Sequence, residues 1–379
     1  MEYKEYELGE LLYYEQPTPY IVESTDYNDA YETPVLTAGK SFILGYTDEK
    51  EGIYDQLPVI IFDDFTTASQ YVNFKFKVKS SAMKILTPVT ELVLPKYIYY
   101  RIQIIQFDHS THKRYWIQQY SKIRVSIPPI PEQECIVARI EELFSQLDAG
   151  VETLKKTKAQ LAVYRQAVLK EAFEGDYPRK QLKEFSKAIS GFAFKSSRYS
   201  PDGNYVVVKI GNVKERHFDF SRDLTKTLEA DDSILEKYLL RRGDCLITLT
   251  GSRGKRDYGF VAMVGNQNNY LLNQRVAALR FDQSVALPEF FQYYLASPSY
   301  RDMFFGYETG NVGQGNVGMK ALLDPYVILP DIDTQKRIIE DVEDRLSVCD
   351  SIEQTVDTAL QQAEAMRQSI LKDAFEGRL

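Results

Sequence analysis

Residues 127–177 read IPPIPEQECIVARIEELFSQLDAGVETLKKTKAQLAVYRQAVLKEAFEGDY, and residues 329–379 read LPDIDTQKRIIEDVEDRLSVCDSIEQTVDTALQQAEAMRQSILKDAFEGRL. The two stretches align without a gap at an offset of 202 residues, and 17 of the 51 aligned positions are identical. Both have a proline at the second position and a glutamine at the seventh, and both carry Ala-Phe-Glu-Gly just before their last two residues. A repeat of this length predicts a chain made of two similar parts, each an irregular region followed by a helix.

Each copy of the repeat predicts one long amphipathic helix. Apolar residues recur in steps of three, four and seven, which is the spacing of a single helical stripe. The first stripe consists of Ile136, Ile140, Leu143, Leu147, Val151, Leu154, Leu161, Val168 and Ala172. The second consists of Ile338, Val342, Leu346, Cys349, Ile352, Val356, Ala363, Ile370 and Ala374. Neither stripe can be buried by its own helix, so we expect the two helices to pack antiparallel as a coiled coil, with pseudo-twofold symmetry.

The ends of both helices carry recognisable signals. The proline-rich residues 128–131 predict a start near Glu132, because proline is excluded from a helix interior. Gly175 and Gly377 predict the two ends, as glycines that follow a helix in the left-handed conformation. A helix of about 40 residues is roughly 60 Å long. We expect Phe173 and Phe375 to pack at the helix ends, where the repeated Ala-Phe-Glu-Gly also offers two equivalent docking surfaces for a partner.

The chain is long enough for two domains in addition to the helices. We divide it into domain 1 (1–126), a central helix (127–175), domain 2 (176–327) and a C-terminal helix (328–379). Both domains are predicted to be rich in strands with a few short helices, so the fold class is α+β. The predicted strands contain residues 20–22, 41–44, 59–62 and 72–76 in domain 1, and 206–210, 245–249, 260–264 and 276–280 in domain 2. The predicted short helices contain residues 92–105 and 288–296.

Composition favours a cytoplasmic globular protein with free thiols. Hydrophobic residues make up 44% and charged residues 26% of the chain, which is ordinary for this class. No run of about 18 apolar residues predicts a membrane span, and the acidic first residues disfavour a secretory signal. The three cysteines, Cys135, Cys245 and Cys349, are too widely spaced for a zinc site, and we expect Cys135 and Cys349 to be buried.

The net charge of −8 is unevenly distributed. Domain 2 alone carries a net charge of +4, whereas the other three segments are acidic. This pattern permits DNA binding through local patches and disfavours indiscriminate coating of DNA.

Catalytic motifs are missing from the sequence. It contains no phosphate-binding P-loop, no dinucleotide-binding glycine motif and no Asn-Pro-Pro-aromatic motif of an adenine methyltransferase. The three histidines lack metal-ligand spacing. The adjacent carboxylates Asp63 and Asp64 follow a predicted strand, where such a pair more often caps a turn than binds a metal. We therefore expect a binding protein with no cofactor of its own.

Polar and cationic clusters in the predicted loops of domain 2 favour DNA contact. Residues 250–256 combine glycines, which let the backbone approach a surface, with cations at the loop tip. Residues 268–275 supply the amide and guanidinium groups that read adenine and guanine edges. An ordinary solvated turn is the alternative in each case. The predicted DNA-binding residues of domain 2 are Lys195, Arg198, Arg253, Lys255, Arg256, Asn273, Gln274, Arg275, Gln314 and Asn316.

Domain 1 has its own candidates. The alternating residues 74–79 predict a strand with lysines on one face and aromatic residues on the other. A basic strand face followed by small hydroxyl residues suits phosphate contact, and a solvated face is again the alternative. The predicted DNA-binding residues of domain 1 are Lys40, Lys75, Lys77, Ser80, Ser81, Lys84, Lys113 and Arg114.

Taken together, these features resemble the specificity subunit of type I restriction–modification systems. The resemblance rests on the helix starts IPPIPEQ and LPDIDTQ, the two AFEG endings, and the segments SGFAFKSSRY, VVVKIGNV, GDCLITLTGSRG, LLNQRV and GQGN of domain 2. Domain 1, with PVLTAGK, IIFDDFTT and FKFKVKSSAMKI, looks like a target-recognition domain of a different subtype. The second helix start departs from the first, since Asp331 and Asp333 replace prolines.

The resemblance implies a non-catalytic subunit that binds double-stranded DNA. Each target-recognition domain would read one half of a split sequence, and the paired helices would set the gap. Two methyltransferase subunits would carry S-adenosylmethionine, and restriction subunits with ATP and Mg²⁺ would join them in a bacterial or archaeal cytoplasm. Two alternatives stay open: a coiled-coil interaction protein with two β-rich binding domains, and a nuclease that uses Asp63, Asp64 and Glu91.

Overall fold

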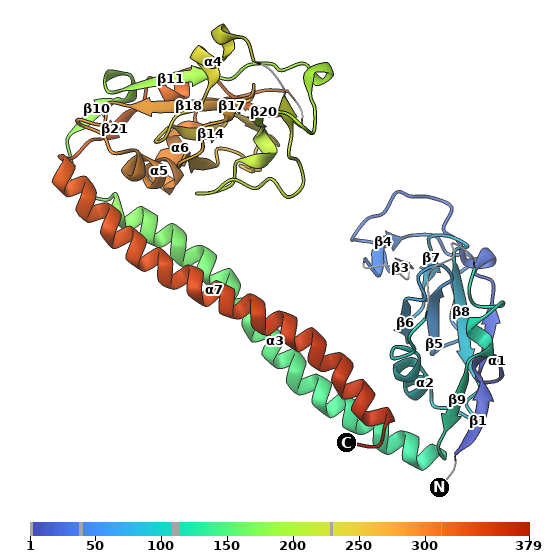
Figure 1. Cartoon of the computed structure of the whole chain (residues 1–379). Coiled ribbons are helices and arrows are strands. Elements are labelled where there is room, and N and C mark those ends of the chain that lie inside the picture. The colour runs from blue at the N-terminus through green and yellow to red at the C-terminus, as the bar shows by residue number, and fades with distance from the viewer. Residues whose placement is uncertain (1–2, 38–40, 108–113, 228–229, 312) are drawn as a thin grey trace. The chain divides into compact units, whose positions relative to one another are not determined.

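The computed structural model describes residues 3–37, 41–107, 114–227, 230–311 and 313–379 (Figure 1). It divides into two compact units, Met1–Leu154 with Asp357–Leu379, and Lys155–Val356. The units cut both long helices near their middles. Each unit therefore holds one globular domain, the first half of one long helix and the second half of the other.

Domain 1 contains a four-stranded sheet in the order β2-β8-β5-β6, a three-stranded sheet β4-β3-β7, and the pair β1-β9. Its strands are β1 Lys4–Glu7, β2 Leu12–Glu15, β3 Thr33–Leu36, β4 Ile43–Thr47, β5 Val59–Asp63, β6 Ser69–Val72, β7 Lys77–Val78, β8 Met83–Pro88 and β9 Arg124–Ile127. Its helices are α1 Leu8–Leu11 and α2 Pro95–Ile102, with 3-10 turns η1 Thr18–Tyr20 and η2 Tyr120–Lys122.

Domain 2 contains a four-stranded sheet β11-β18-β14-β16, the three-stranded sheets β13-β12-β17 and β15-β20-β19, and the pair β10-β21. Its strands are β10 Arg179–Gln181, β11 Ser186–Ser190, β12 Tyr205–Val208, β13 Lys226–Thr227, β14 Cys245–Thr248, β15 Thr250–Gly251, β16 Val261–Met263, β17 Tyr270–Leu272, β18 Val276–Phe281, β19 Glu308–Thr309, β20 Gly315–Val317 and β21 Tyr326–Ile328. Its helices are α4 Asp232–Tyr238, α5 Pro288–Ala296 and α6 Pro298–Phe305, with 3-10 turns η3 Leu182–Glu184, η4 Ser196–Arg198, η5 Ile210–Asn212 and η6 Met319–Leu322.

The two domains share one topology. The order β2-β8-β5-β6 corresponds to β11-β18-β14-β16, and in both sheets every neighbouring pair is antiparallel. The parallel pair β3·β7 corresponds to β12·β17. Domain 2 adds β15, β19, β20, α4 and α6. A position in one domain therefore has a structural counterpart in the other, although the two loop sequences differ.

Most of the predicted short elements are confirmed. The strands predicted at 59–62, 206–210, 245–249, 260–264 and 276–280 correspond to β5, β12, β14, β16 and β18, and both short helices are present. The strand predicted at 20–22 is wrong, because this segment forms η1 and a single bridge at Ile21. The strand predicted at 72–76 is also wrong in extent, because β6 ends at Val72 and β7 begins at Lys77.

The two long helices are α3, Ile130–Ala172, and α7, Ile332–Phe375. A glutamine at the same position of the repeat, Gln133 or Gln335, hydrogen-bonds the first turn of each helix to its domain. Gln133 accepts the Leu94 N–H at 2.8 Å and donates to the Leu92 and Pro128 carbonyls. Gln335 accepts the Leu287 N–H at 2.8 Å and donates to the Val285 and Pro330 carbonyls. Both glutamine side chains are fully buried. Each one therefore holds the start of its helix against the segment that precedes α2 or α5.

The prediction of a start at Glu132 is corrected, because α3 already includes Ile130 and Pro131. Proline is compatible with the first turn, where its missing N–H would have no helical partner. At the start of α7, Asp331 accepts the Thr334 N–H at 2.8 Å, which caps the helix without the prolines of the first copy. The backbone and side-chain hydrogen bonds from Thr334 lower the pKa of Asp331, so this cap remains charged at neutral pH.

Within each unit the helix segments pack antiparallel, as predicted. In the first unit Asp148 of α3 pairs with Arg367 of α7, and in the second Arg165 of α3 pairs with Asp350 of α7 at 2.6 Å. As the residue number rises along α3, the partner's number falls along α7. The two pairs are the same pair of the repeat, since 148 and 165 become 350 and 367 on adding the offset of 202.

The phenylalanines of the AFEG motifs pack against the domains, as expected. Phe375 meets the Tyr97 ring of α2 at 5.2 Å, and Phe173 meets the Phe290 ring of α5 at 5.4 Å. Gly377 has φ +70° and follows α7, which confirms its predicted role. The prediction for Gly175 is wrong: α3 ends at Ala172, and Gly175 is not left-handed.

Both predicted stripes are buried or half-buried, with one exception. Ile352 is 40% exposed, because the neighbouring Cys349, Glu353 and Val356 occupy the inner face at this turn. Cys135 is also exposed, which contradicts its predicted burial, whereas Cys349 is buried as expected. Among the helices of the described segments, none combines the length and apolarity that a membrane span needs.

Candidate nucleic-acid interface

The turn between β17 and β18 of domain 2 presents Gln274 and Arg275 to solvent. Arg275 has φ +72°, a backbone conformation that residues other than glycine rarely adopt. The backbone enforces it from several sides, since Leu249 N donates to Arg275 O at 2.9 Å and Gln274 N donates to Phe192 O at 2.8 Å. Strained residues that are held in this way cluster at ligand-binding sites. No described residue forms a hydrogen bond or ion pair with the Arg275 guanidinium, which leaves its donors available.

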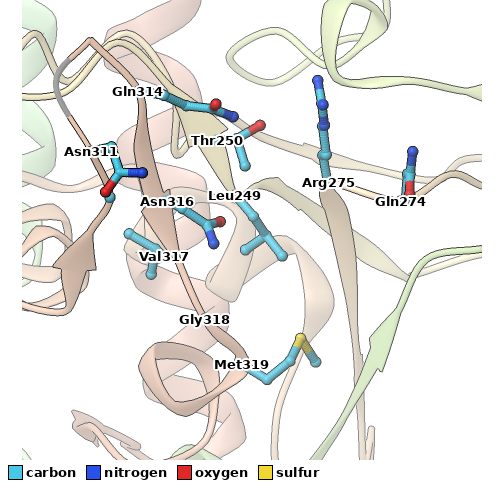
Figure 2. A pocket seen from close by; sticks show the side chains of 11 residues that line it. Leu249, Thr250, Gln274, Arg275, Asn311, Gln314, Asn316, Val317, Gly318 and Met319 are labelled. Carbon is cyan, nitrogen blue, oxygen red and sulfur yellow. The ribbon is translucent and has the colours of Figure 1, made fainter.

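This turn borders a hollow of about 520 Å³, lined by both polar and apolar residues. Figure 2 shows Arg275 extended on one side of it and Thr250 and Gln314 on the other. The antiparallel pairing of β15 with β20 sets Thr250 opposite Asn316. Four predicted residues are thereby brought together from two segments, 274–275 and 314–316. The lining comprises Leu249, Thr250, Gln274, Arg275, Gly310, Asn311, Gln314, Asn316, Val317, Gly318 and Met319.

The loop at 250–259 is largely held by its own domain. Arg253 donates to the Gly310 carbonyl at 2.7 Å, and Arg256 forms an ion pair with Asp302 at 2.7 Å. Arg301 donates to the carbonyls of Arg256, Tyr258 and Gly259. The two predicted arginines of this loop are therefore partly engaged within the domain. Lys255 is exposed at its tip and has no side-chain partner among the described residues.

Hydrogen bonds and burial fix the protonation states of the groups in and around this loop. Hydrogen bonds from the side chain and backbone of Ser252 lower the pKa of Asp257. Burial, and next the hydrogen bond to Glu308 at 2.8 Å, raise the pKa of Tyr258. Burial lowers the pKa of Arg301, although it stays far above neutrality as an arginine. Asp257 thus remains a carboxylate and Tyr258 a neutral donor, which keeps the loop folded at neutral pH.

Domain 1 carries the counterpart of the Arg275 turn at Ser80, Ser81 and Ala82. Asp64 N donates to Ala82 O at 3.2 Å, just as Leu249 N donates to Arg275 O. The registers Asp63↔Met83 and Thr248↔Val276 align the two turns residue by residue. Ala82 therefore occupies the place of Arg275, and Ser81 that of Gln274. Ser80 and Ser81 are exposed, which is compatible with their predicted contact with DNA.

Two predicted phosphate contacts in domain 1 are wrong. Lys77 is 4% exposed, pairs with Glu49 at 2.8 Å and donates to the Glu51 carbonyl. Lys84 is 1% exposed, pairs with Asp64 at 3.4 Å and donates to Gln16. The side-chain alternation of residues 74–79 is broken because this stretch is not one continuous strand. These ammonium groups are therefore unable to reach a phosphate.

The remaining candidates are exposed but scattered. Lys75 pairs loosely with Asp55 at 3.7 Å, and Arg198 pairs with Asp231 at 3.9 Å. Arg114 precedes Tyr115, whose N–H donates to Asp64 O, so it lies beside the domain 1 turn. Lys195 and Arg198 do not line the hollow. Lys40 and Lys113 lie outside the described residues.

Sequence reasoning missed Thr250 and Asn311 as lining residues. The signal for Asn311 was its place beside Gln314 in the glycine- and asparagine-rich loop. At the other end of the chain, Asp63 caps a turn as expected, because its carboxylate accepts the N–H groups of Phe65 and Thr66 at 2.8 Å each. Among the described residues, no three His, Cys, Asp or Glu side chains gather closely enough to hold a metal ion.

Comparisons with known proteins place the sequence of this chain beside a described family. Residues 174–362 match the family model described as the type I restriction modification DNA specificity domain. The type I restriction enzyme EcoR124I/EcoR124II specificity subunit of Escherichia coli is 45% identical over 196 residues, which are 48% of this chain and 48% of that protein. The EcoKI specificity subunit of Escherichia coli K12 is 28% identical over 69% of this chain and 58% of its own length. The chain thus spans about half the length of the curated relatives it matches.

A solved structure is also similar over the whole chain. It is titled as the structural basis underlying complex assembly and conformational transition of the type I R-M system. The match covers 100% of this chain and 98% of that one, with a TM-score of 0.70 and 18% sequence identity. This likeness supports the fold.

Proposed function

We propose that this chain, which belongs to the family of type I restriction–modification DNA specificity subunits, reads a two-part DNA sequence, one part with each domain. The observation that carries the proposal is the pair of equivalent turns. One topology presents Ser80 and Ser81 in domain 1 and Gln274 and Arg275 in domain 2. Two domains with the same fold but different side chains at the equivalent turn are suited to two half-sites of different sequence.

The side chains at these turns are suited to base edges in the major groove. Arginine donates two hydrogen bonds to guanine O6 and N7, and glutamine pairs with adenine N6 and N7. Serine hydroxyls are less selective donors and acceptors. Exposed cations such as Lys75, Arg114, Lys195 and Lys255 would supply sequence-independent phosphate contacts. Affinity and sequence selectivity would therefore reside in different residues of the same domain.

The paired helices would set the number of unread base pairs between the two half-sites. The duplicated helix starts and AFEG ends would also offer equivalent surfaces to two methyltransferase subunits. Those partners would bring S-adenosylmethionine and flip the target adenine out of the duplex for methylation. Restriction subunits with ATP and Mg²⁺ would complete the cytoplasmic complex, and this chain would contribute binding and orientation.

Selection from a random duplex pool tests this function. The chain would be assembled with its methyltransferase subunit and used to enrich bound duplexes over several rounds. We expect the enriched duplexes to contain two short constant blocks of different sequence, separated by a constant number of variable base pairs. Enrichment of one continuous block, or of no sequence at all, would contradict the proposal.

The first prediction concerns Arg275→Ala. Loss of a bidentate contact to guanine should weaken binding of the selected duplex by about 1–3 kcal/mol and relax one base position in one block. The other block should stay unchanged, because it is read by domain 1. Titration of duplexes with single substitutions measures both effects. Arg242→Ala is the matched control, since it removes an exposed arginine of the same domain outside the hollow. Equal effects of the two variants would remove Arg275 from the readout.

A further inference from the structure

A short β-bridged loop of domain 2 reaches α7 through Arg216. The loop is closed by the bridge Val213↔Phe218 and by the hydrogen bond from Lys214 N to His217 O at 2.9 Å. Arg216 has φ +68°, and its N–H donates to the Val261 carbonyl of β16 at 2.7 Å. Its guanidinium donates to both carboxylate oxygens of Asp350, at 3.2 and 3.4 Å. Another arginine of domain 2 with a positive φ is thus fixed by its backbone, and its side chain reaches Asp350 of α7 and also interacts with Tyr293 of α5.

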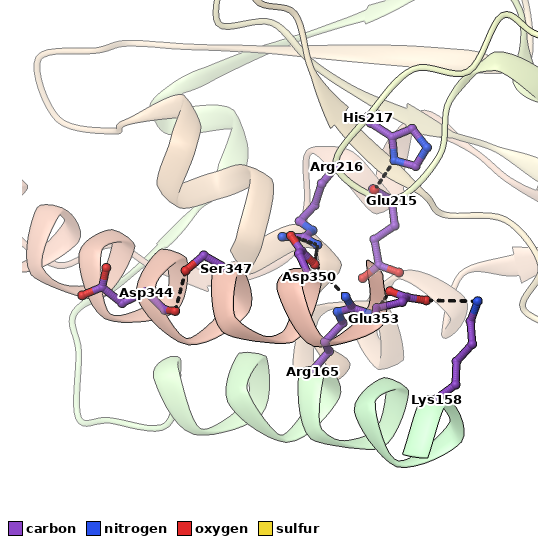
Figure 3. Close-up of polar contacts among 9 residues, drawn as sticks. All are labelled: Lys158, Arg165, Glu215, Arg216, His217, Asp344, Ser347, Asp350 and Glu353. Carbon is purple, nitrogen blue, oxygen red and sulfur yellow. Dashed lines mark hydrogen bonds and ion pairs between the residues drawn. The ribbon is translucent and has the colours of Figure 1, made fainter. Parts of the chain in front are cut away.

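Asp350 is the centre of a charge network within the second unit. Arg165 of α3 donates to Asp350 at 2.6 Å and to Glu353 at 2.6 Å, and Lys158 pairs with Glu353 at 3.6 Å. Figure 3 shows Arg216 approaching Asp350 from domain 2 and Arg165 approaching it from α3. The network therefore connects three parts of the second unit, which are the loop of domain 2, α3 and α7.

Comparison of the two copies of the repeat shows which contacts of this network occur in both units and which occur in the second unit alone, among the described residues. The pair of Asp350 with Arg165 recurs in the first unit as Asp148 with Arg367. Among the described residues, Arg367 is the one ion-pair partner of Asp148. The position of Glu353 is taken by Val151 in the first copy. The contact from a domain to the helix aspartate is therefore an addition of the second unit.

Among the hydrogen bonds and ion pairs of the described residues, the contact of Arg216 with Asp350 joins domain 2 to α7 at the point farthest from the start of the helix. Nearer the helix start, domain 2 is hydrogen-bonded to α7 at Gln335 and at Glu343, which accepts a hydrogen bond from Tyr293 at 3.3 Å, and Val342 and Leu346 of α7 pack in the apolar core of the domain. Asp350 lies about 15 residues beyond Gln335, a distance of roughly 22 Å along the helix. The ion pair with Arg216 extends the contact of domain 2 with α7 by about one helical turn beyond Leu346, and so further restricts the tilt of the domain on its helix.

We propose that Arg216 is a positioning residue that sets the direction of domain 2 on its helix segments, and thereby the strictness of the gap in the DNA target. The proposal rests on the proposed function. Arg216 would touch no base, so its loss would leave the sequence of both blocks intact. It would instead allow domain 2 to follow a half-site displaced by one base pair.

The test compares Arg216→Ala with Arg216→Lys and with the control Arg242→Ala, each in the complex with the methyltransferase subunit. The measured quantity is the affinity for the selected duplex divided by the affinity for the same blocks with one more base pair between them. Because the ion pair is partly exposed, we expect Arg216→Ala to lower this ratio about twofold to fivefold. Arg216→Lys should lower it less, and Arg242→Ala should leave it unchanged. An unaltered ratio in Arg216→Ala, or a changed base preference in either block, overturns the proposal.

Hydrogen exchange of the chain without DNA measures whether the side chain of Arg216 holds its loop in place. The amides of Lys214 and Arg216, both hydrogen-bonded in the loop, should exchange about threefold to tenfold faster in Arg216→Ala than in Arg242→Ala. Equal protection in the two variants overturns the proposal even if the duplex selection succeeds. If the selection yields no two-part target, the proposed function fails, and this exchange measurement still tells whether Arg216 holds the loop.

Discussion

Asp64→Ala should destabilise domain 1 by about 3–5 kcal/mol, because it leaves the buried Lys84 ammonium without a counterion. Asp64 is 1% exposed, and besides the ion pair it accepts the Trp116 N–H at 2.8 Å. Its own backbone N–H holds the turn at Ala82. The variant therefore removes the counterion of Lys84 and the acceptor of the Trp116 N–H beside the turn at Ala82.

The measurement uses the single tryptophan of the chain. Trp116 is buried in domain 1 and contacts Asp64 directly, so its fluorescence follows the unfolding of this domain in urea. Asp55→Ala is the matched control, since Asp55 pairs with Lys75 on the surface and its loss should change stability by less than about 0.5 kcal/mol. The double variant Asp64→Ala with Lys84→Met should recover part of the loss, because no buried charge remains. A shift in Asp64→Ala no larger than in Asp55→Ala would show that the pair is not a structural element.

Lengthening both long helices by one turn should move the gap of the recognised sequence. Four residues inserted after Gly150 in α3 and four after Glu364 in α7 keep the two helices in register, because Asp148 and Arg367 lie opposite each other just beside these points. The insertions add about 6 Å, or one to two base pairs at roughly 3.4 Å each. Affinity for the original duplex should fall at least about a hundredfold, since most base contacts of one block are lost together.

Duplexes with gaps from two base pairs shorter to three longer measure this shift. An insertion in α3 alone is the control: it breaks the alignment of the buried stripes and should destabilise the chain without selecting a new gap. A folded double-insertion variant that prefers the original gap would show that the helices do not measure the spacing.

The sequence predicted the helical framework well because its evidence is repeated. Identity at Gln133 and Gln335, at Asp148 and Asp350, and at Arg165 and Arg367 marks the places where the same contact is made twice. The spacing of apolar residues, in steps of three, four and seven, was sufficient to predict two long antiparallel helices. Local exceptions such as Gly175 depend on one backbone angle, which a glycine does not reveal.

The candidate site was only partly predictable. The burial of Lys77 and Lys84 depends on Glu49 and Asp64, which come from other elements, so their charges on an apparent strand face were misleading. The role of Arg275 follows from a left-handed backbone angle and from hydrogen bonds to distant segments. The equivalence of the two turns is visible only in the strand order, because their side chains have almost nothing in common.

Crosslinking from the two turns tests the central claim most directly. A photoreactive residue would replace Ser81 in one variant and Gln274 in another, each assembled with the methyltransferase subunit on the selected duplex. The account predicts that Ser81 crosslinks to bases of one block only and Gln274 to bases of the other block only. Crosslinks from both positions to the same block would contradict it.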